Sequence, residues 1–474
     1  MMNTKALRQK ILDLAIHGKL VPQDPNDEPA SVLLERIKAE KERLIKEGKI
    51  KRTKRSKAAC DKPHYPFELP EGWEWCKLED IVSFGGGKTP SMSVRQYWEN
   101  GTNLWVTSKD MKKERINDSL MKITDAALEG MNIYEKGTIL VVTRSGILKH
   151  TLPLAILVKK ATVNQDLKTI SPYMLSLSEY LYFAIKANEK EILANYHKDG
   201  TTVDSIDFDK FRCLPIALPP MYEQERIVKC IKYWFSLIES IEENRDKLQE
   251  VIKQTKSKIL DLAIHGKLVP QDPSDEPASE LLERINPKAE ITCDNPHYRN
   301  LPFQIPSTWA WCSHNDVLEI SGGSQPAKRF FSSVPQKGYV RLYQIRDYGE
   351  NPIPVYIPTE YAMKQTEKGD ILLARYGGSL GKVFHAQKGA YNVAMAKVIF
   401  KDKDLINKEY AYFYYLSDLY QGRLKEISRT AQAGFNSSDF NEMYFPLPPY
   451  EEQQRIVNAI NKAFTTLDAI AKNL

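Results

Sequence analysis

Two stretches of the chain look like phosphate-binding loops, and each lacks a residue that this chemistry needs. Residues 87–89, Gly-Lys-Thr, match the end of such a loop, but Val82 stands where its first glycine belongs. Residues 377–382 also end in Gly-Lys, with Tyr376 at the first-glycine position and Val383 in place of the magnesium-binding hydroxyl. The sequence therefore predicts no nucleotide site in either stretch.

Other candidate catalytic patterns are also incomplete. Residues 447–450, Leu-Pro-Pro-Tyr, resemble the Asp/Asn-Pro-Pro-Tyr motif of amino-methyltransferases, but Leu447 removes the polar acceptor that would hold an adenine amino group. None of the 8 histidines lies in a His-Glu-x-x-His pattern, and no two of the 6 cysteines form a Cys-x-x-Cys pair. We expect a chain with no catalytic residue, no bound cofactor and no metal site.

The composition is that of a globular protein. The 474 residues are enough for two or three domains, with 42% hydrophobic and 27% charged residues. The net charge of +6 allows an anionic partner without requiring one, because 67 basic residues face 61 acidic ones. Residues 1–20 show no secretory pattern, and no apolar run reaches about 18 residues. We expect a cytoplasmic protein with no membrane partner.

The chain is an internal repeat. Residues 10–37 and 258–285 differ only at Asn26/Ser274 and Val32/Glu280. Two shorter repeated pairs flank what lies between: Pro-His-Tyr to Trp-x-Trp-Cys at 63–76 and 296–312, and Leu-Pro-Pro-x-x-Glu-Gln-x-Arg-Ile-Val at 218–228 and 447–457. Near-identical segments therefore separate two bodies of sequence, which we call the modules.

The two modules differ in their residues but share an order of features. Each has a Gly-rich turn, a polar stretch after a short apolar run, a Glu-Lys-Gly turn and a later asparagine. These features are residues 85–87 and 322–323, 105–110 and 342–347, 135–137 and 367–369, and Asn164 and Asn392. We expect two α+β domains of one design, and Trp73, Trp75, Trp309 and Trp311 in core strands rather than in base-stacking platforms.

The segments between the modules have the apolar spacing of a long helix. The central stripe starts after Pro219-Pro220, ends before Gly266 and alternates by four and three residues. Its residues are Ile227, Ile231, Trp234, Ile238, Ile241, Leu248, Ile252, Ile259 and Leu262. The chain ends repeat parts of it, with Leu7, Ile11 and Leu14 at one end and Ile456, Ile460, Leu467 and Ile470 at the other.

This spacing predicts one continuous helix from Tyr222 to Ile264, about 65 Å long at about 1.5 Å per residue. The two termini together supply almost one further helix. We expect a long antiparallel two-helix coiled coil with a module at each end and a pseudo-twofold axis between the halves. A bundle helix buried in a single core is the alternative, but it does not explain why the termini complement each other.

The combination of motifs resembles the specificity subunits of type I restriction–modification systems over essentially the whole chain. The motifs that carry the resemblance are the Leu-Pro-Pro entry to the helix (218–228 and 447–457), Gly-Lys-Leu-Val-Pro-Gln-Asp-Pro after it (18–25 and 266–273), and the stretches 105–112 and 374–383. The first module departs from the last of these, with Thr-Arg-Ser-Gly-Ile-Leu-Lys-His at 143–150.

The resemblance implies a non-catalytic DNA-binding subunit. Each target-recognition domain would read one half of a bipartite site in double-stranded DNA, and the helices would set the spacing and dock two modification subunits. Those partners would carry S-adenosylmethionine, and restriction subunits would use ATP and magnesium. The implied divisions are 1–60 (helical region and basic linker), 61–220 (first recognition domain), 221–290 (central coiled coil), 291–449 (second recognition domain) and 450–474 (C-terminal helix).

On this interpretation, basic and polar residues near the Gly-rich turns are the candidates for DNA contact. They are Lys88, Thr89, Ser108, Lys109, Arg144, Ser145, Lys149 and His150 in the first module, and Lys328, Arg329, Gln344, Arg346, Arg375, Tyr376 and Lys382 in the second. A phosphate contact or a solvated position competes with base reading at each of them. The basic stretch 51–57 is either a solvated linker or an arm that neutralises phosphates.

Three other functions stay open. A self-sufficient methyltransferase would transfer methyl groups to DNA by itself. A coiled-coil scaffold would show no DNA sequence preference. The same architecture could also serve a modification system without a nuclease, which genes for the partners would decide.

Overall fold

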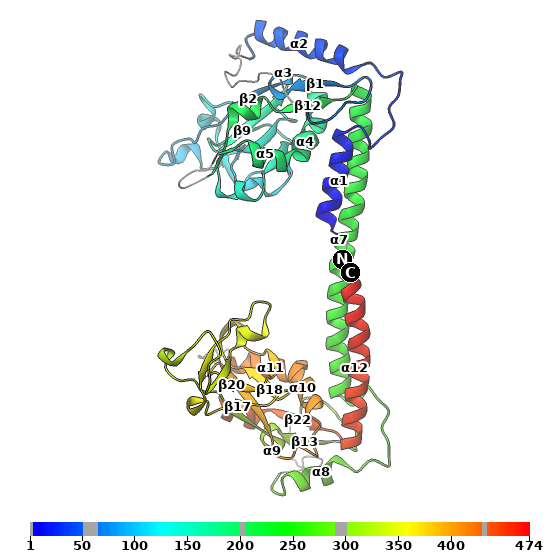
Figure 1. The fold of residues 1–474 in the computed structure, drawn as a ribbon, viewed down its shortest axis with the longest axis vertical. Coiled ribbons are helices and arrows are strands. Elements are labelled where there is room, and N and C mark those ends of the chain that lie inside the picture. Colours follow the sequence, from blue (N-terminus) through cyan, green and yellow to red (C-terminus); the bar gives the residue numbers. More distant parts are fainter. Residues whose placement is uncertain (1–2, 51–64, 199–203, 290–300, 429–433) are drawn as a thin grey trace. The chain divides into compact units, whose positions relative to one another are not determined.

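The computed structural model describes residues 3–50, 65–198, 204–289, 301–428 and 434–474. It divides into two compact units, Met2–Asn244 and Arg245–Leu474 with Met1. The division falls inside α7 (Met221–Ile264), a continuous helix of 44 residues (Figure 1). The helix predicted from Tyr222 to Ile264 is therefore confirmed to within one residue.

In the first unit, α1 (Thr4–Ile16) lies antiparallel to the first half of α7. Arg8 near the start of α1 forms an ion pair with Glu242 at 2.8 Å, whereas Gln23, just beyond α1, donates to Glu223 at the start of α7. Asn3 caps α1 by accepting from the backbone N–H of Ala6. Ile11 of α1 shares one buried core with residues of α7.

In the second unit, α12 (Tyr450–Asn473) pairs with the second half of α7 in the same antiparallel sense. Asp468 near the end of α12 accepts from Lys256 at 2.5 Å, and Glu452 in its first turn accepts from Gln271, which follows α7. Ile456 and Ile460 are fully buried. Each unit thus contains the antiparallel helix pair that the repeat predicts.

The predicted apolar stripe is only partly buried. Ile227, Ile231, Ile238, Ile252, Ile11, Ile456 and Ile460 are buried, and Ile259, Leu262, Leu14 and Leu467 are half-buried. Five members are exposed: Leu7, Trp234, Ile241, Leu248 and Ile470.

The prediction is wrong at Trp234, which is 44% exposed, and Phe235 is buried in its place. The reason is that α7 packs against more than one helix. The Phe235 ring contacts Phe183 of α4 (Ser178–Ala187) at 6.0 Å between centroids, and the guanidinium of Arg8 in α1 lies 5.7 Å from the centroid of the same ring. A helix that faces two neighbours buries a wider stripe than a two-helix seam. Ile241 and Ile470, near the ends of the paired stretches, are 46% and 43% exposed.

The first and last strands of the first module, β1 (Glu74–Lys77) and β12 (Pro215–Leu218), pair with each other in antiparallel register. Between them lies a five-stranded sheet in the order β2-β9-β6-β7-β4 and a three-stranded sheet in the order β5-β3-β8. The bounds are β2 Val82–Gly86, β3 Asn103–Val106, β4 Arg115–Ile116, β5 Met121–Ile123, β6 Ile139–Val142, β7 Leu154–Leu157, β8 Ala161–Val163 and β9 Leu167–Pro172; a hairpin of β10 (His197–Lys198) and β11 (Ser205–Ile206) follows. Helices α2 (Ala30–Lys46), α3 (Leu78–Ile81), α5 (Glu189–Asn195) and α6 (Phe208–Arg212) complete the unit.

The second module repeats this plan. Strands β13 (Ala310–Ser313) and β22 (Tyr444–Leu447) pair antiparallel, and two four-stranded sheets have the orders β14-β21-β18-β19 and β16-β15-β20-β17. The bounds are β14 Leu318–Gly322, β15 Tyr339–Tyr343, β16 Tyr356–Pro358, β17 Gln365–Thr366, β18 Ile371–Ala374, β19 Val383–His385, β20 Gly389–Tyr391 and β21 Met395–Phe400, with α8 Ala278–Ile285, α9 His314–Val317, α10 Lys408–Leu416 and α11 Asp418–Ser428. Trp73, Trp309 and Trp311 are buried and Trp75 is half-buried, so they pack against the core. Trp75 and Trp311 lie in β1 and β13 as predicted, but the prediction of a strand is wrong for Trp73 and Trp309, which lie one residue before these strands.

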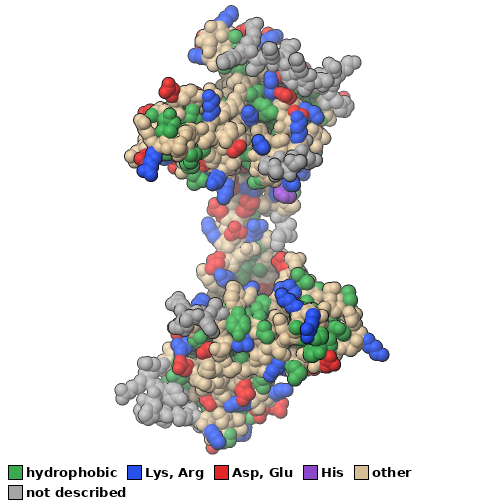
Figure 2. All heavy atoms as spheres, turned by 90° about the vertical axis from the view of Figure 1, so that its left-hand side faces the viewer, with side chains coloured by type: hydrophobic (Ala, Val, Ile, Leu, Met, Phe, Trp, Pro, Cys, Tyr) green, Lys and Arg blue, Asp and Glu red, His purple; other side chains and the backbone are tan. Residues whose placement is uncertain are grey.

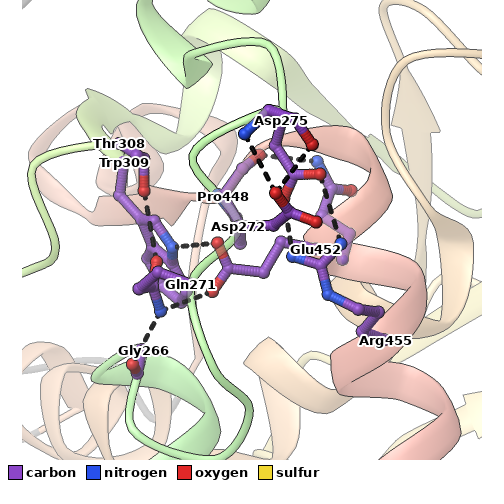
Figure 3. A network of polar contacts seen from close by, with 11 residues as sticks. Gly266, Gln271, Asp272, Asp275, Thr308, Trp309, Pro448, Glu452 and Arg455 are labelled. Carbon is purple, nitrogen blue, oxygen red and sulfur yellow. Dashed lines mark hydrogen bonds and ion pairs between the residues drawn. The ribbon is translucent and has the colours of Figure 1, made fainter.

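A polar network joins each module to its helix pair, and we call it the junction network. In the second unit, Trp309 donates its indole N–H to Glu452 at 2.9 Å, and Gln271 donates to the other oxygen of Glu452 and to the carbonyl of Gly266 (Figure 3). Arg455 in the next turn of α12 pairs with Asp275 at 2.6 Å. Burial raises the pKa of the Glu452 carboxyl.

The same network occurs in the first unit with the same residue types. Trp73 donates to Glu223 at 2.9 Å, Gln23 donates to Glu223 and to the carbonyl of Gly18, and Arg226 pairs with Asp27. Gly18 has φ +65°, and a Cβ there would lie 2.4 Å from the ring of Pro70. Because Gly266 has φ +67° and meets Pro306 at the same distance, both glycines are required by this packing.

Candidate nucleic-acid interface

Four backbone segments of the first module meet at one end of its sheets. Strands β3 and β8 run parallel and end at the same edge, where Asn164 donates its backbone N–H to Val106. The N–H of Lys88 reaches the carbonyl of Val163 at 3.1 Å, and the N–H of Thr143 reaches that of Asp166. We call the segments 87–90, 107–110, 143–146 and 164–166 the first loop cluster.

The second module has the equivalent arrangement. Asn392 donates its N–H to Tyr343 at 3.1 Å, Ser324 donates to Tyr391, and Arg375 donates to Ala394. Segments 323–326, 344–347, 375–378 and 392–394 form the second loop cluster. The correspondence of Asn164 with Asn392 that the sequence suggested is therefore confirmed by their backbone contacts.

The Gly-rich turns serve close packing at these clusters. A Cβ on Gly87 would lie 1.5 Å from the carbonyl oxygen of Val163, and one on Gly323 would lie 2.1 Å from that of Asn392. No side chain fits at either position. The glycines allow one loop to pass directly over the end of a strand.

Two of the three acidic residues in the clusters, Asp110 and Asp347, are turned inward, and the third, Asp166, is half-buried and accepts from the side-chain amide of Asn164 at 2.9 Å. Asp110 is 9% exposed and accepts from the backbone N–H groups of Thr107 and Leu120, each at 2.8 Å. Asp347 accepts from the N–H of Gln344 at 2.8 Å and pairs with Arg341. Their negative charges are thereby used within the loops rather than presented at the surface.

The basic residues of the first cluster point outward. Lys88, Lys109 and Arg144 are exposed, and Ser108 is exposed beside them. The Lys88 ammonium donates to the carbonyl of Gly130 at 3.2 Å. Exposed cations above buried carboxylates give a surface that suits a polyanion. Basic and acidic side chains are otherwise interspersed on the face of each unit drawn in Figure 2, so the local arrangement is more informative than the net charge.

The remaining candidates of the first module lie around the cluster. Thr89 donates to Gln165, Ser145 accepts from the N–H of Ile147, and His150 is exposed. The Lys149 ammonium lies 3.9 Å from the buried carboxylate of Asp204.

In the second module, Arg375 is half-buried because it packs internally. Its guanidinium lies 4.9 Å from the ring centroid of Tyr376 and donates to the carbonyl of Phe435 at 3.3 Å. Tyr376 is 45% exposed. Arg346 is exposed in the cluster, and Gln344 is half-buried; Lys328 and Arg329 lie on a separate exposed turn, and Lys382 is exposed beyond the cluster. The assignment of DNA contacts to these residues stays a prediction.

The strand pairing shows which residues of the loops after β6 and β18 correspond to each other. The sequence alone did not establish this correspondence. Val142 pairs with Leu167, and Ala374 pairs with Met395. Two residues further along, Arg144 forms an isolated β-bridge with Ser205, and Tyr376 forms one with Gly434. Arg144 therefore corresponds to Tyr376 and not to Arg375.

Sequence reasoning missed two features of the clusters. The first is Gln165, whose side chain accepts a hydrogen bond from Thr89. Gln165 directly follows the repeated Asn164, and this position could have marked it as part of the cluster. The Oδ1 atoms of Asn164 and Asn392 are buried, and neither has a hydrogen-bond partner among the described residues. Within the described ranges, no three His, Cys, Asp or Glu side chains are grouped to hold a metal ion, and no helix is long and apolar enough to cross a membrane.

These observations define a class of protein with one α+β domain present twice, each copy attached to an antiparallel helix pair by the same polar network. The family model described as "Type I restriction modification DNA specificity domain" matches residues 70–250 and 306–474. The chain belongs to this family, which confirms the resemblance seen in the sequence.

The relatives found by comparison agree. The Escherichia coli type I restriction enzyme EcoAI specificity subunit is 30% identical over 398 residues, covering 70% of this chain and 65% of that subunit. The Escherichia coli EcoEI specificity subunit is 26% identical over 99% of this chain and 90% of its own length. A solved chain reported under "Structural basis underlying complex assembly and conformational transition of the type I R-M system" has a TM-score of 0.57 at 17% identity, covering 86% of this chain and 94% of that chain. That likeness supports the fold.

Proposed function

We propose that this chain is the DNA-recognition subunit of a type I restriction–modification complex, in which each module reads one half of a bipartite site in double-stranded DNA. The observation that carries the proposal is the pair of loop clusters, which share one backbone frame and differ in their exposed side chains. A frame that occurs twice with different residues suits two different half-sites. Two linked readers gain affinity only when the gap between the half-sites fits their separation.

The helices act as the spacer between the readers. The ion pairs of Arg8 with Glu242 and of Asp468 with Lys256 support a coiled coil in which the two termini follow one another along α7. In that arrangement, the length of α7 sets the distance between the half-sites. The helical register also fixes their relative orientation around the duplex.

The helices also dock two modification subunits. Nearly identical surfaces in both repeats suit two copies of one partner, since pseudo-symmetry presents the same interface twice. Separately from the repeat, Tyr233, Trp234, Leu237 and Ile241 are exposed on α7 at 60%, 44%, 38% and 46%, and such apolar surface favours a protein partner. The matching positions of α12 are Lys462, Ala463, Thr466 and Ile470, so this patch is present in one repeat only. The modification subunits bring S-adenosylmethionine, and restriction subunits bring ATP and magnesium; this chain contributes recognition and no catalytic group.

Methylome sequencing of cells that carry the chain with its modification subunits tests this function. We expect methylated adenines in one asymmetric bipartite sequence, and none when the chain is omitted. The purified chain alone should transfer no tritiated methyl groups to DNA, whereas a self-sufficient methyltransferase would. Methylation without sequence preference would leave only a scaffold role and would contradict the proposal.

A further inference from the structure

In each module, one exposed side chain leaves the loop cluster from a backbone that is held on both sides. In the first module, Thr143 donates its N–H to Asp166, and Ser145 donates its N–H to Asp204 at 3.1 Å. Arg144 lies between them and bridges to Ser205. In the second module, Tyr376 follows Arg375, whose N–H is bound by Ala394, and bridges to Gly434.

Arg144 is the one arginine in the first loop cluster, and its side chain is not held as several of the other candidates are. Among the described residues, none forms a hydrogen bond or ion pair with the Arg144 guanidinium, and the side chain is exposed. By contrast, Lys149 lies near Asp204, Lys88 donates to Gly130, and Arg375 is held against Phe435. A free guanidinium on a fixed backbone retains all its donors for a ligand.

Positions 144 and 376 carry different side chains, as expected if the two modules read different half-sites. The frame around them is common to both modules: Gly87 and Gly323, Asp110 and Asp347, Asn164 and Asn392. On this frame, position 144 carries a guanidinium, which can bind guanine O6 and N7 in the major groove, and position 376 carries a phenol ring with a hydroxyl. The tyrosine cannot make that bidentate contact, so the two modules present different hydrogen-bonding groups to DNA at this point.

We infer that Arg144 and Tyr376 are equivalent specificity-determining residues. Arg144 contacts a guanine in the half-site of the first module, and Tyr376 contacts a different base pair at the corresponding place in the other half-site. This inference rests on the proposed function, because it assigns a reading position within modules that bind DNA.

The test is the full complex with modification subunits and the substitution Arg144→Ala, scored by methylome sequencing and by methylation rates on oligonucleotides. We expect the preference for one G·C pair in one half-site to fall by roughly 5- to 150-fold, which corresponds to the loss of a bidentate base contact. The other half-site should keep its full specificity, which also shows that the protein is folded and assembled.

Two matched variants separate base reading from a phosphate contact. Lys109→Ala removes an exposed cation from the same cluster and should weaken methylation of all sequences alike. Arg144→Lys keeps the charge but loses the planar pair of donors, so it should relax the same G·C position as Arg144→Ala. Tyr376→Ala should relax one position in the opposite half-site.

Specific outcomes overturn the inference. Unchanged specificity in Arg144→Ala, or uniform weakening that Arg144→Lys restores, would make this side chain a phosphate contact or a solvated residue. If the wild-type complex itself methylated no bipartite sequence, the proposed function would fail as well, and that result is seen before any variant is made.

Discussion

At the scale of single residues, the junction network shows how a few polar side chains orient a whole module. Trp309 and Trp73 are buried, and their only polar atom is given to the glutamates that begin α12 and α7. These contacts fix three parts of the chain to one another: the first turn of each helix, the loop after the preceding helix, and the entry to the module. The binding surface carried by the module inherits this orientation.

Trp309→Phe should therefore destabilise the second unit. The substitution keeps most of the ring but leaves one oxygen of the buried Glu452 without its donor, a loss of about 1–3 kcal/mol. Urea denaturation of the full chain would measure it. Trp98→Phe is the control, since Trp98 donates to the carbonyl of Ser91 near the surface and should cost less. Equal losses in both variants would contradict a special role for the junction.

The buried glutamates also predict a pH dependence. Burial raises the pKa of Glu452 above its ordinary 4.5, so the folded state binds this proton more tightly than the unfolded chain. The contribution of Glu452 to stability is largest below pH 4.5 and falls as pH rises through the raised pKa. The free energy of unfolding of the wild type, compared with that of Glu452→Gln, should fall accordingly. A difference that grows with pH would show that the carboxylate form is the stabilising one.

At the scale of elements, the sequence predicted those features that depend on neighbouring residues and missed those that depend on residues distant in the chain. The bounds of α7 follow from Pro220 and Gly266, which lie next to the helix they limit. Trp234 was misplaced because the burial of Phe235 depends on Phe183, which is distant in sequence. The loop clusters were found only as a set of polar residues, since β3 and β8 must first pair in parallel before Lys88, Arg144 and Asn164 come together.

An insertion in α7 tests the spacer role of this element. Seven residues added after Glu250 extend a helix by about 10 Å and nearly keep its rotational phase. Since DNA rises about 3.4 Å per base pair, the gap between methylated half-sites should lengthen by about three base pairs with their sequences unchanged. Seven residues added after Gly48, whose surroundings are open, should leave the gap as it was. An unaltered gap in the first variant would remove the spacer role from α7.

At the scale of the whole molecule, the repeat predicts that the modules are exchangeable. β1 and β12 pair with each other at the two ends of the first module, Glu74 with Leu218, so the module is closed before α7 begins. Replacing residues 61–218 with the first module of another family member should therefore alter one half-site of the methylated sequence and leave the other unchanged. The junction glutamate Glu223 lies outside the exchanged segment, so the donor module needs a tryptophan at the place of Trp73 to be oriented correctly. The reciprocal exchange of residues 291–447 is the matched control and should alter only the other half-site. Methylome sequencing of both chimaeras separates the possibilities, because a change in both half-sites from either exchange would mean that the modules do not read DNA independently.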